Sequence, residues 1–227
     1  RHQMLLGEEQ VLLQRMGVAG TALSERRRAA AAALSAQIES ELRDLNMQGA
    51  RFLVDIASSD ASDGVPVDGR TLAWSATGLD RIEFLIAPNP GEAPQALART
   101  ASGGETSRLM LAMKNALSAS DVIPTLIFDE IDAGIGGRTA DIVGHKLWAL
   151  AREHQVFCVT HLAQMACYGE RHLRVSKELI DGRTVSVVKA LSPEERIEEL
   201  AVMLGGAATE AARRNAAELL QRVAQQR

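Results

Sequence analysis

Two short apolar runs separated by a helical stretch constrain the fold more than any other feature of this sequence. The runs are "TLIFD" at 125–129 and "QVFCVT" at 155–160, and the stretch between them is 137–151. A strand, a helix and a second strand in this order form a βαβ unit, whose two strands are parallel and buried on both faces. The sequence therefore predicts an α/β fold with a parallel sheet, in which ligands bind at the carboxyl ends of the strands.

Acidic and imidazole side chains follow these two strands. Asp129 and Glu130 end the first strand, Asp132 comes two residues later, and His161 follows the second strand. An apolar strand that ends in aspartate is the Walker B arrangement of nucleotide hydrolases, in which the aspartate supports Mg²⁺ and an adjacent glutamate can deprotonate a water molecule. The alternative is an acidic surface turn beside a histidine that only caps a helix.

A serine and two glycines open a predicted helix in the segment "ASGGETSRLMLAMKNALS" at 101–118. Ser102 and Glu105 have the spacing of a capping box, which needs no ligand. A helix start also presents unpaired N–H groups, and Gly103 and Gly104 carry no side chain that would keep a phosphate away. Both interpretations remain open on this segment alone.

The residues before this segment predict a helical part followed by a small β unit. Residues 4–47 contain no proline and carry an apolar stripe, which predicts one or two long helices. The glycines of "GVAG" at 17–20 are expected to break or kink this helix. It is either the end of a coiled-coil arm or an amphipathic helix packed on the core. The runs at 50–56 and 80–87 predict an antiparallel pair of strands, separated by the polar stretch 58–69.

The remaining elements are a helix at 104–118, expected to be buried on most sides, a strand at 184–190 and two helices within 193–226. The net charge of −4 argues against a chain that coats nucleic acid by charge alone. Two cysteines do not make a disulfide framework, and no apolar run is long enough to cross a bilayer. These features favour a cytoplasmic location.

The four motifs together are more specific than any one of them. In order, they resemble the signature motif at 102–105, the Walker B motif at 125–130, the D-loop at Asp132 and the switch histidine at His161 of an ABC-type ATPase head. Four segments are similar in sequence to the RecN family of bacterial DNA repair proteins: "FLIAPNPGE", "ASGGETSRLMLAMKNAL", "IFDEIDAGIGG" and "VTHLAQMA". Members of this family are SMC-like proteins with heads at the end of a coiled-coil arm, and the resemblance covers roughly residues 78–190.

The resemblance implies a head that is complete only with a second lobe. A P-loop, G-x-x-x-x-G-K-[ST], would cradle the phosphates, but none of the four lysines of this chain follows a glycine. In RecN-like proteins the P-loop lies in the N-terminal lobe, before the coiled coil. The chain is therefore expected to be the C-terminal lobe alone, and its start at Arg1 fits that expectation.

The resemblance also implies roles for individual residues. On ATP held by the same head, Asp129 supports Mg²⁺, Glu130 is the general base and His161 contacts the γ-phosphate. A second group belongs to the site of the opposite head, with Asp132 aligning the dimer interface and the signature residues reaching the γ-phosphate: Ser102, Gly103, Gly104 and Glu105.

The predicted organisation is a helical arm segment at 1–48 and the C-terminal lobe of an ABC/SMC-type ATPase head at 49–227. The expected partners are the P-loop lobe of the same protein, a second head in a homodimer, and DNA, without a membrane. The location implied is the cytoplasm of a bacterium, at the nucleoid. Two alternatives stay open: a non-enzymatic interaction module, and the ATPase subunit of an ABC transporter, although transporters usually carry Gln where this chain has Glu105.

Overall fold

A computed structural model describes residues 1–97, 103–117, 122–180 and 182–226. The chain divides into two compact units. The first unit comprises residues 1–43 and 47–100, and the second comprises residues 44–46 and 101–227. The helix of the predicted arm thus shares a unit with the β-strands that follow it, whereas the sequence suggested a boundary at residue 48. That the helix belongs to a coiled-coil arm stays a prediction.

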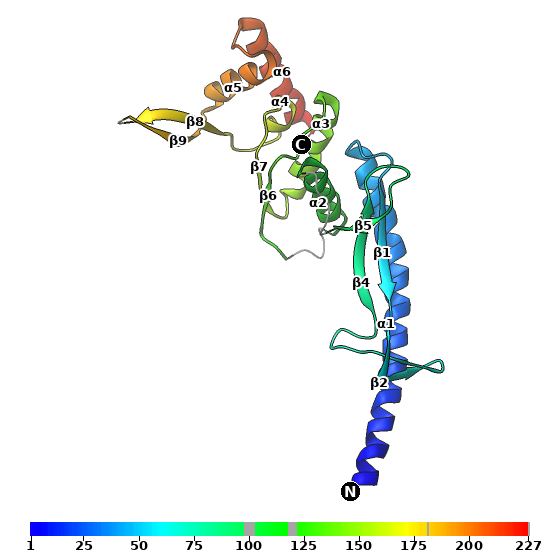
Figure 1. Ribbon diagram of the computed structural model, residues 1–227. Helices are drawn as coiled ribbons and strands as arrows, with labels where there is room; N and C mark the ends of the chain where they lie inside the picture. Colours follow the sequence, from blue (N-terminus) through cyan, green and yellow to red (C-terminus); the bar gives the residue numbers. More distant parts are fainter. Residues whose placement is uncertain (98–102, 118–121, 181, 227) are drawn as a thin grey trace. The chain divides into compact units, whose positions relative to one another are not determined.

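Helix α1 (His2–Asp44) is a single uninterrupted helix (Figure 1). The expected break at 17–20 is therefore wrong, and packing explains why these glycines are tolerated. A Cβ atom on Gly17 would lie 2.6 Å from the carbonyl oxygen of Pro66, and one on Gly20 would lie 2.5 Å from a methyl carbon of Leu79. The glycines cost helix propensity, but they let the neighbouring segment pack directly on the helix backbone.

The predicted antiparallel pair is confirmed: β1 (Arg51–Ala57) pairs along its whole length with β4 (Arg81–Ala87). A short strand, β5 (Gln95–Ala96), adds to the other edge of β4. The base of β1 is joined to α1 by Glu39, whose carboxylate accepts hydrogen bonds from the backbone N–H of Phe52 and from the side chain of Arg51.

The polar stretch 58–69, which separates the two predicted strands, contributes a further strand. Strand β2 (Asp60–Val67) pairs with β3 (Arg70–Leu72) in a hairpin. Asp68 and Gly69 between them both have positive φ, 47° and 79°. An Asp-Gly pair is a strong signal for a two-residue turn of this kind. The buried side chains of Val65 and Leu72 pack with residues of α1, which accounts for a polar strand at this position.

The second unit contains the predicted βαβ arrangement. Strand β6 (Thr125–Phe128) pairs in parallel with β7 (Gln155–Cys158), and helix α3 (Gly137–Leu150) connects them. Helix α2 (Gly103–Leu117) precedes β6 and is largely buried or half-buried, as expected from its apolar sequence. The parallel pairing brings the ends of β6 and β7 to one edge, where the candidate residues lie.

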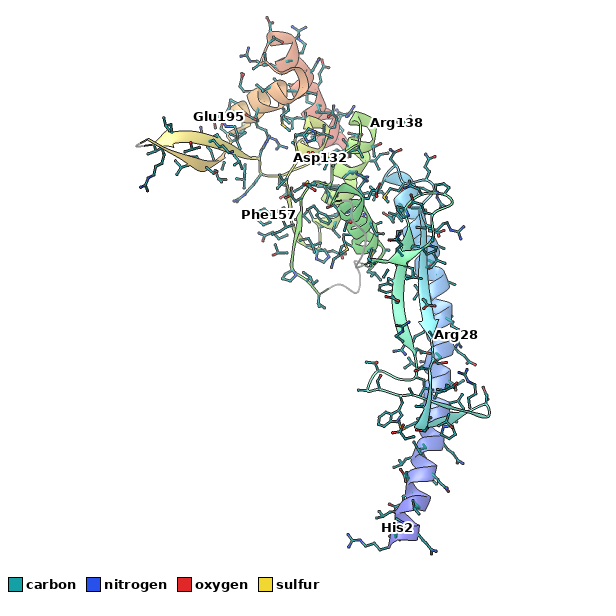
Figure 2. All side chains as sticks on the ribbon, in the orientation of Figure 1. His2, Arg28, Asp132, Arg138, Phe157 and Glu195 are labelled. Atoms are coloured by element: carbon teal, nitrogen blue, oxygen red, sulfur yellow. The ribbon has the colours of Figure 1, made fainter. Side chains whose placement is uncertain are left out.

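The expectation that both faces of this sheet are buried is wrong for the described residues. Leu126 and Phe128 are buried on one face, whereas Ile127 is 73% exposed and its register partner Phe157 is 44% exposed on the other. Phe157 is labelled in Figure 2. The apolar residue types predicted burial correctly for one face, and the described chain provides no cover for the other.

The remainder of the second unit is a hairpin and a helical layer. Residues 173–180, for which no strand was expected, form a strand that pairs with the predicted third one; the two are drawn in yellow in Figure 1. Small and apolar side chains of the short helix and the two final helices form a core cluster. These elements are β8 (Leu173–Ile180), β9 (Arg183–Ala190), α4 (Ala163–Ala166), α5 (Pro193–Gly205) and α6 (Glu210–Gln226).

Within the described residues, no helix combines the length and the apolar character needed to cross a bilayer. Both cysteines are free thiols. Helix α5 begins with a capping box formed by Ser192 and Glu195, and Gly206 with φ 74° ends it.

The packing of α1 predicts opposite effects of the same substitution at two of its glycines. Gly7 has no heavy atom within contact range of an added Cβ, so Gly7→Ala should raise the free energy of unfolding by about 0.5–1 kcal/mol. Gly17→Ala places a Cβ against the backbone of Pro66, so it should lower that free energy by about 1–3 kcal/mol. Urea denaturation followed by circular dichroism measures both. Stabilisation by both substitutions would contradict the packing described.

Candidate functional site

Asp129 and Glu130 lie directly after β6, and both are exposed. One carboxylate oxygen of Asp129, Oδ1, accepts a hydrogen bond from the backbone N–H of Glu130 at 2.9 Å. This bond fixes the orientation of the Asp129 side chain at the end of the strand. The two carboxylates therefore occupy the carboxyl edge of the sheet, as the sequence predicts.

Glu130 has a backbone conformation that L-residues rarely adopt, with φ at 56°. The turn is closed by a hydrogen bond from the N–H of Ala133 to the carbonyl oxygen of Glu130, at 3.0 Å. A left-handed conformation costs a residue with a Cβ about 1–2 kcal/mol. Local strain of this kind is concentrated at functional sites, so the conformation directs attention to Glu130.

Asp132 is buried, with its side chain 6% exposed, and it joins the two strand ends. Its Oδ2 atom accepts a hydrogen bond from Thr160 Oγ1 at 2.6 Å and another from the backbone N–H of His161 at 2.9 Å. The Nδ1 atom of His161 lies 2.9 Å from the same oxygen. Two hydrogen bonds and the close approach of an imidazole nitrogen thus meet one carboxylate oxygen, which compensates for removing the charge from water.

His161 is the exposed member of this group, since its side chain is 75% exposed. Because Nδ1 lies 2.9 Å from the Asp132 carboxylate, the other ring nitrogen, Nε2, is the one available to a group outside the chain. The backbone N–H of Leu162 donates to Thr160 Oγ1 at 3.0 Å, so the turn that carries His161 is itself hydrogen-bonded.

The start of helix α2 packs against the loop that follows β6. A Cβ atom on Gly104 would lie 2.8 Å from the Cβ of Ala133, and one on Gly103 would collide with the carboxylate of Glu130. Close approach within the chain therefore requires glycine at 104, whereas at 103 the exposed end of the Glu130 side chain can move aside. Glu105, in the first turn, is half-buried, and Ser102 lies outside the described residues.

Two side chains of α2 bind the same loop. Ser107 Oγ donates to the carbonyl oxygen of Asp129 at 2.7 Å, and the buried Arg108 donates to the carbonyl oxygen of Ala133 at 2.8 Å. Burial lowers the pKa of Arg108 from its usual value, and the nearby charge of Glu105 partly opposes this shift. The helix start and the acidic loop are thereby held together as one site.

Sequence reasoning did not find Ser107, Arg108 or Thr160. A signal existed for Arg108, because an arginine within a helix predicted to be buried on most sides needs buried hydrogen-bond acceptors. Ser107 and Thr160 carry no such signal, since hydroxyl side chains are common on any surface. The structure brings together six of the seven described members of the predicted set, and the seventh, Glu105, lies in the first turn of α2. The six are Gly103, Gly104, Asp129, Glu130, Asp132 and His161.

Cys158 is the one thiol near the site. Burial, followed by the charges of Asp132 and Asp129, raises the pKa of Cys158 to about 12. The thiol therefore stays protonated at neutral pH, which makes it a poor nucleophile and a poor metal ligand.

No group of three or more metal-binding side chains is present in the part of the chain that the structure describes. Mg²⁺ does not need one, because it is usually held by one or two carboxylates together with waters and substrate phosphates. Asp129 fits this requirement, since its carboxylate is exposed at the carboxyl end of β6.

The fold resembles a known class of ATPase domain. No family model matches the chain. The Smc head domain with a coiled coil and joint from Pyrococcus yayanosii aligns with a TM-score of 0.52 and 19% identity, covering 80% of this chain and 30% of that structure. The fold is that of a lobe of an ABC/SMC-type ATPase head.

The curated relatives identify the family. DNA repair protein RecN of Streptomyces coelicolor is 42% identical over 215 residues, which is 94% of this chain and 38% of that protein. RecN of Xylella fastidiosa is 47% identical over 184 residues, or 81% of this chain and 31% of that protein. RecN of Bacillus subtilis is 37% identical over 207 residues, or 89% of this chain and 36% of that protein. The chain belongs to the RecN family and corresponds to the C-terminal part of its proteins, spanning about a third of their length.

The left-handed conformation of Glu130 predicts that glycine is the preferred residue there for stability alone. Glu130→Gly should leave the chain about 0.5–1 kcal/mol more stable than Glu130→Ala, because only the alanine retains a Cβ in the strained conformation. Both variants lose the carboxylate, so their difference isolates the backbone effect. Thermal unfolding of the two variants measures it, and an alanine variant at least as stable as the glycine variant would disprove the strain.

Proposed function

We propose that this chain is the C-terminal lobe of an SMC-like ATPase head that acts in DNA double-strand-break repair and recombination. The observation that carries this proposal is the cluster at the carboxyl edge of β6 and β7. There the loop with Asp129 and Glu130 contacts the start of α2, and Asp132 joins this loop to His161. Membership of the RecN family, whose curated members are named as DNA repair proteins, supports DNA as the partner.

The reaction proposed is hydrolysis of ATP. Glu130 is exposed and stands beside Asp129, so its carboxylate can take a proton from a water molecule that attacks the γ-phosphate. Asp129 would hold Mg²⁺, which supplies charge neutralisation to the phosphates when it is bound. His161 presents Nε2 to the γ-phosphate, since Nδ1 is occupied within the chain.

The phosphate cradle has to come from another segment. No lysine of this chain follows a glycine, so the chain has no P-loop of its own. The exposed face of the sheet at Ile127 and Phe157 supports a second lobe that packs against it, because apolar side chains on a parallel sheet are normally covered. In this proposal the P-loop lobe of the same protein completes the head.

The start of α2 is assigned to a second head. Its N-terminal N–H groups and partial positive charge suit a phosphate, and Gly103 is exposed while Gly104 is buried against the loop. Two heads would then close on ATP, each offering its helix start to the nucleotide of the other. Opening after hydrolysis would couple the nucleotide state to the arms and to DNA.

Two competing functions remain testable. An interaction module without catalysis would use the α2 start only as a helix cap and the acidic loop only as a surface turn. The ATPase subunit of a transporter would have an integral membrane protein as its partner. Recovery of membrane proteins instead of DNA in a pull-down would favour the transporter.

The proposal predicts that ATP hydrolysis depends on Glu130 and on the second lobe. In the chain joined to a P-loop lobe, Glu130→Gln should lower turnover by about 10²–10⁴-fold while ATP binding is retained. Glu153→Gln, an exposed glutamate after α3 in the same unit, is the matched control and should leave turnover unchanged. The measurement is steady-state release of phosphate.

Three outcomes would count against this account. Unchanged turnover in the Glu130→Gln variant would remove the general base. Hydrolysis by the isolated chain that depends on Glu130 would mean that its phosphate site is built without a second lobe. Absence of hydrolysis from both forms would favour the interaction module.

A further inference from the structure

The carboxylate of Asp132 is buried against the turn that carries His161. The resemblance to ABC-type heads assigns Asp132 to the dimer interface, yet its side chain is only 6% exposed and faces the end of its own neighbouring strand. Within the described residues, all three groups that contact Oδ2 come from Thr160 and His161. The carboxylate therefore acts on the histidine turn of the same chain.

The contacts divide into two kinds. Thr160 Oγ1 and the backbone N–H of His161 hold the turn itself, at 2.6 and 2.9 Å. The contact at Nδ1 holds the imidazole ring, also at 2.9 Å. The contacts of Thr160 and the backbone N–H are sufficient to hold the turn. The contact at Nδ1 therefore acts on the imidazole ring.

A carboxylate can only accept, so the ring nitrogen that faces it carries the proton. With the proton on Nδ1, the neutral imidazole has an acceptor at Nε2, and the imidazolium has a donor there. In both forms Nε2 points away from Asp132, on a side chain that is 75% exposed. The same arrangement of carboxylate and imidazole fixes the tautomer of catalytic histidines in other enzymes.

We propose that Asp132 is a positioning residue for His161: its carboxylate holds the proton on Nδ1 and so presents Nε2 to the bound phosphate. This inference deepens the proposed function, on which its kinetic consequence rests, whereas the tautomer itself is a property of this chain. It changes the role of Asp132 from a contact across two heads to a contact within one.

Asp132→Ala is the decisive variant, because it removes the oxygen that lies against Nδ1. The proton of the imidazole should then move to Nε2, the nitrogen that carries it in a free neutral histidine. Asp132→Asn should retain the proton on Nδ1, because an amide keeps an acceptor oxygen at the position that Thr160, the backbone N–H and Nδ1 share. Asp141→Asn is the matched control, since Asp141 contacts Tyr168 and Arg222 in the same unit.

The tautomer is measured on the chain itself by nitrogen NMR with labelled histidine, at about pH 9, where a free imidazole is neutral. The signal of His161 is identified by its loss in His161→Gln. The expected result is a proton on Nδ1 in the unsubstituted chain, in Asp132→Asn and in Asp141→Asn, and on Nε2 in Asp132→Ala. A proton on Nε2 in the unsubstituted chain, or an unchanged tautomer in Asp132→Ala, would overturn the proposal.

The kinetic consequence is measured on the complete protein, in which the chain is joined to its P-loop lobe. Asp132→Ala should lower kcat about 10–100-fold, the usual effect of losing such a supporting contact, with little change in KM for ATP. In a His161→Ala background it should add no further loss, because it acts through the ring. An equal loss in both backgrounds would indicate a structural role and overturn the proposal.

The two measurements separate this inference from the proposed function. If the complete protein does not hydrolyse ATP, the proposed function fails, and the NMR result still decides whether Asp132 sets the tautomer of His161. If hydrolysis depends on Glu130 but the tautomer is not set by Asp132, the proposed function stands and the positioning role is wrong.

Discussion

One oxygen of a buried carboxylate connects the parts of the candidate site. Asp132 follows β6, and its partners Thr160 and His161 follow β7, so the contacts at Oδ2 join two loops that are 28 residues or more apart in sequence. The parallel pairing of β6 and β7 brings their ends to the same edge, but pairing alone does not fix the loops beyond the strands. Removing a partner of a buried charge is expensive, so each donor stabilises the position of the other loop.

The start of α2 also contacts the loop that follows β6. Ser107 and Arg108 bind carbonyl oxygens on both sides of Glu130, and Gly104 allows the helix to approach the loop closely. The left-handed conformation of Glu130 persists because these contacts and the turn at Ala133 determine the path of the loop. The residues that the resemblance assigns to two different nucleotides are thus mechanically joined within one chain.

Much of this architecture could be predicted from the pattern of apolar residues. The βαβ unit, the antiparallel pair at β1 and β4, and the two final helices follow from runs whose period and length allow one interpretation. The predictions failed where tertiary contacts decide. Gly17 and Gly20 look like helix breakers until Pro66 and Leu79 are known to pack on them, because propensity describes an isolated helix.

The candidate site could be predicted as a set of residues but not as a geometry. The positions of Asp129, Glu130 and His161 follow from the strand ends, whereas the buried state of Asp132 depends on Thr160, which no local pattern singles out. The exposure of Ile127 shows a second limit of prediction from sequence. An apolar residue type predicts that a face of the sheet is covered, but it does not predict which segment covers that face.

The central claim is that one chain serves two nucleotides, and the most direct measurement is a structure of the complete protein with a non-hydrolysable ATP analogue and Mg²⁺. The account predicts a dimer in which His161 Nε2 contacts the γ-phosphate bound to its own head while the backbone at Gly103 contacts the γ-phosphate of the partner head. A structure in which both contact the same phosphate, or in which neither contacts a nucleotide, would contradict it.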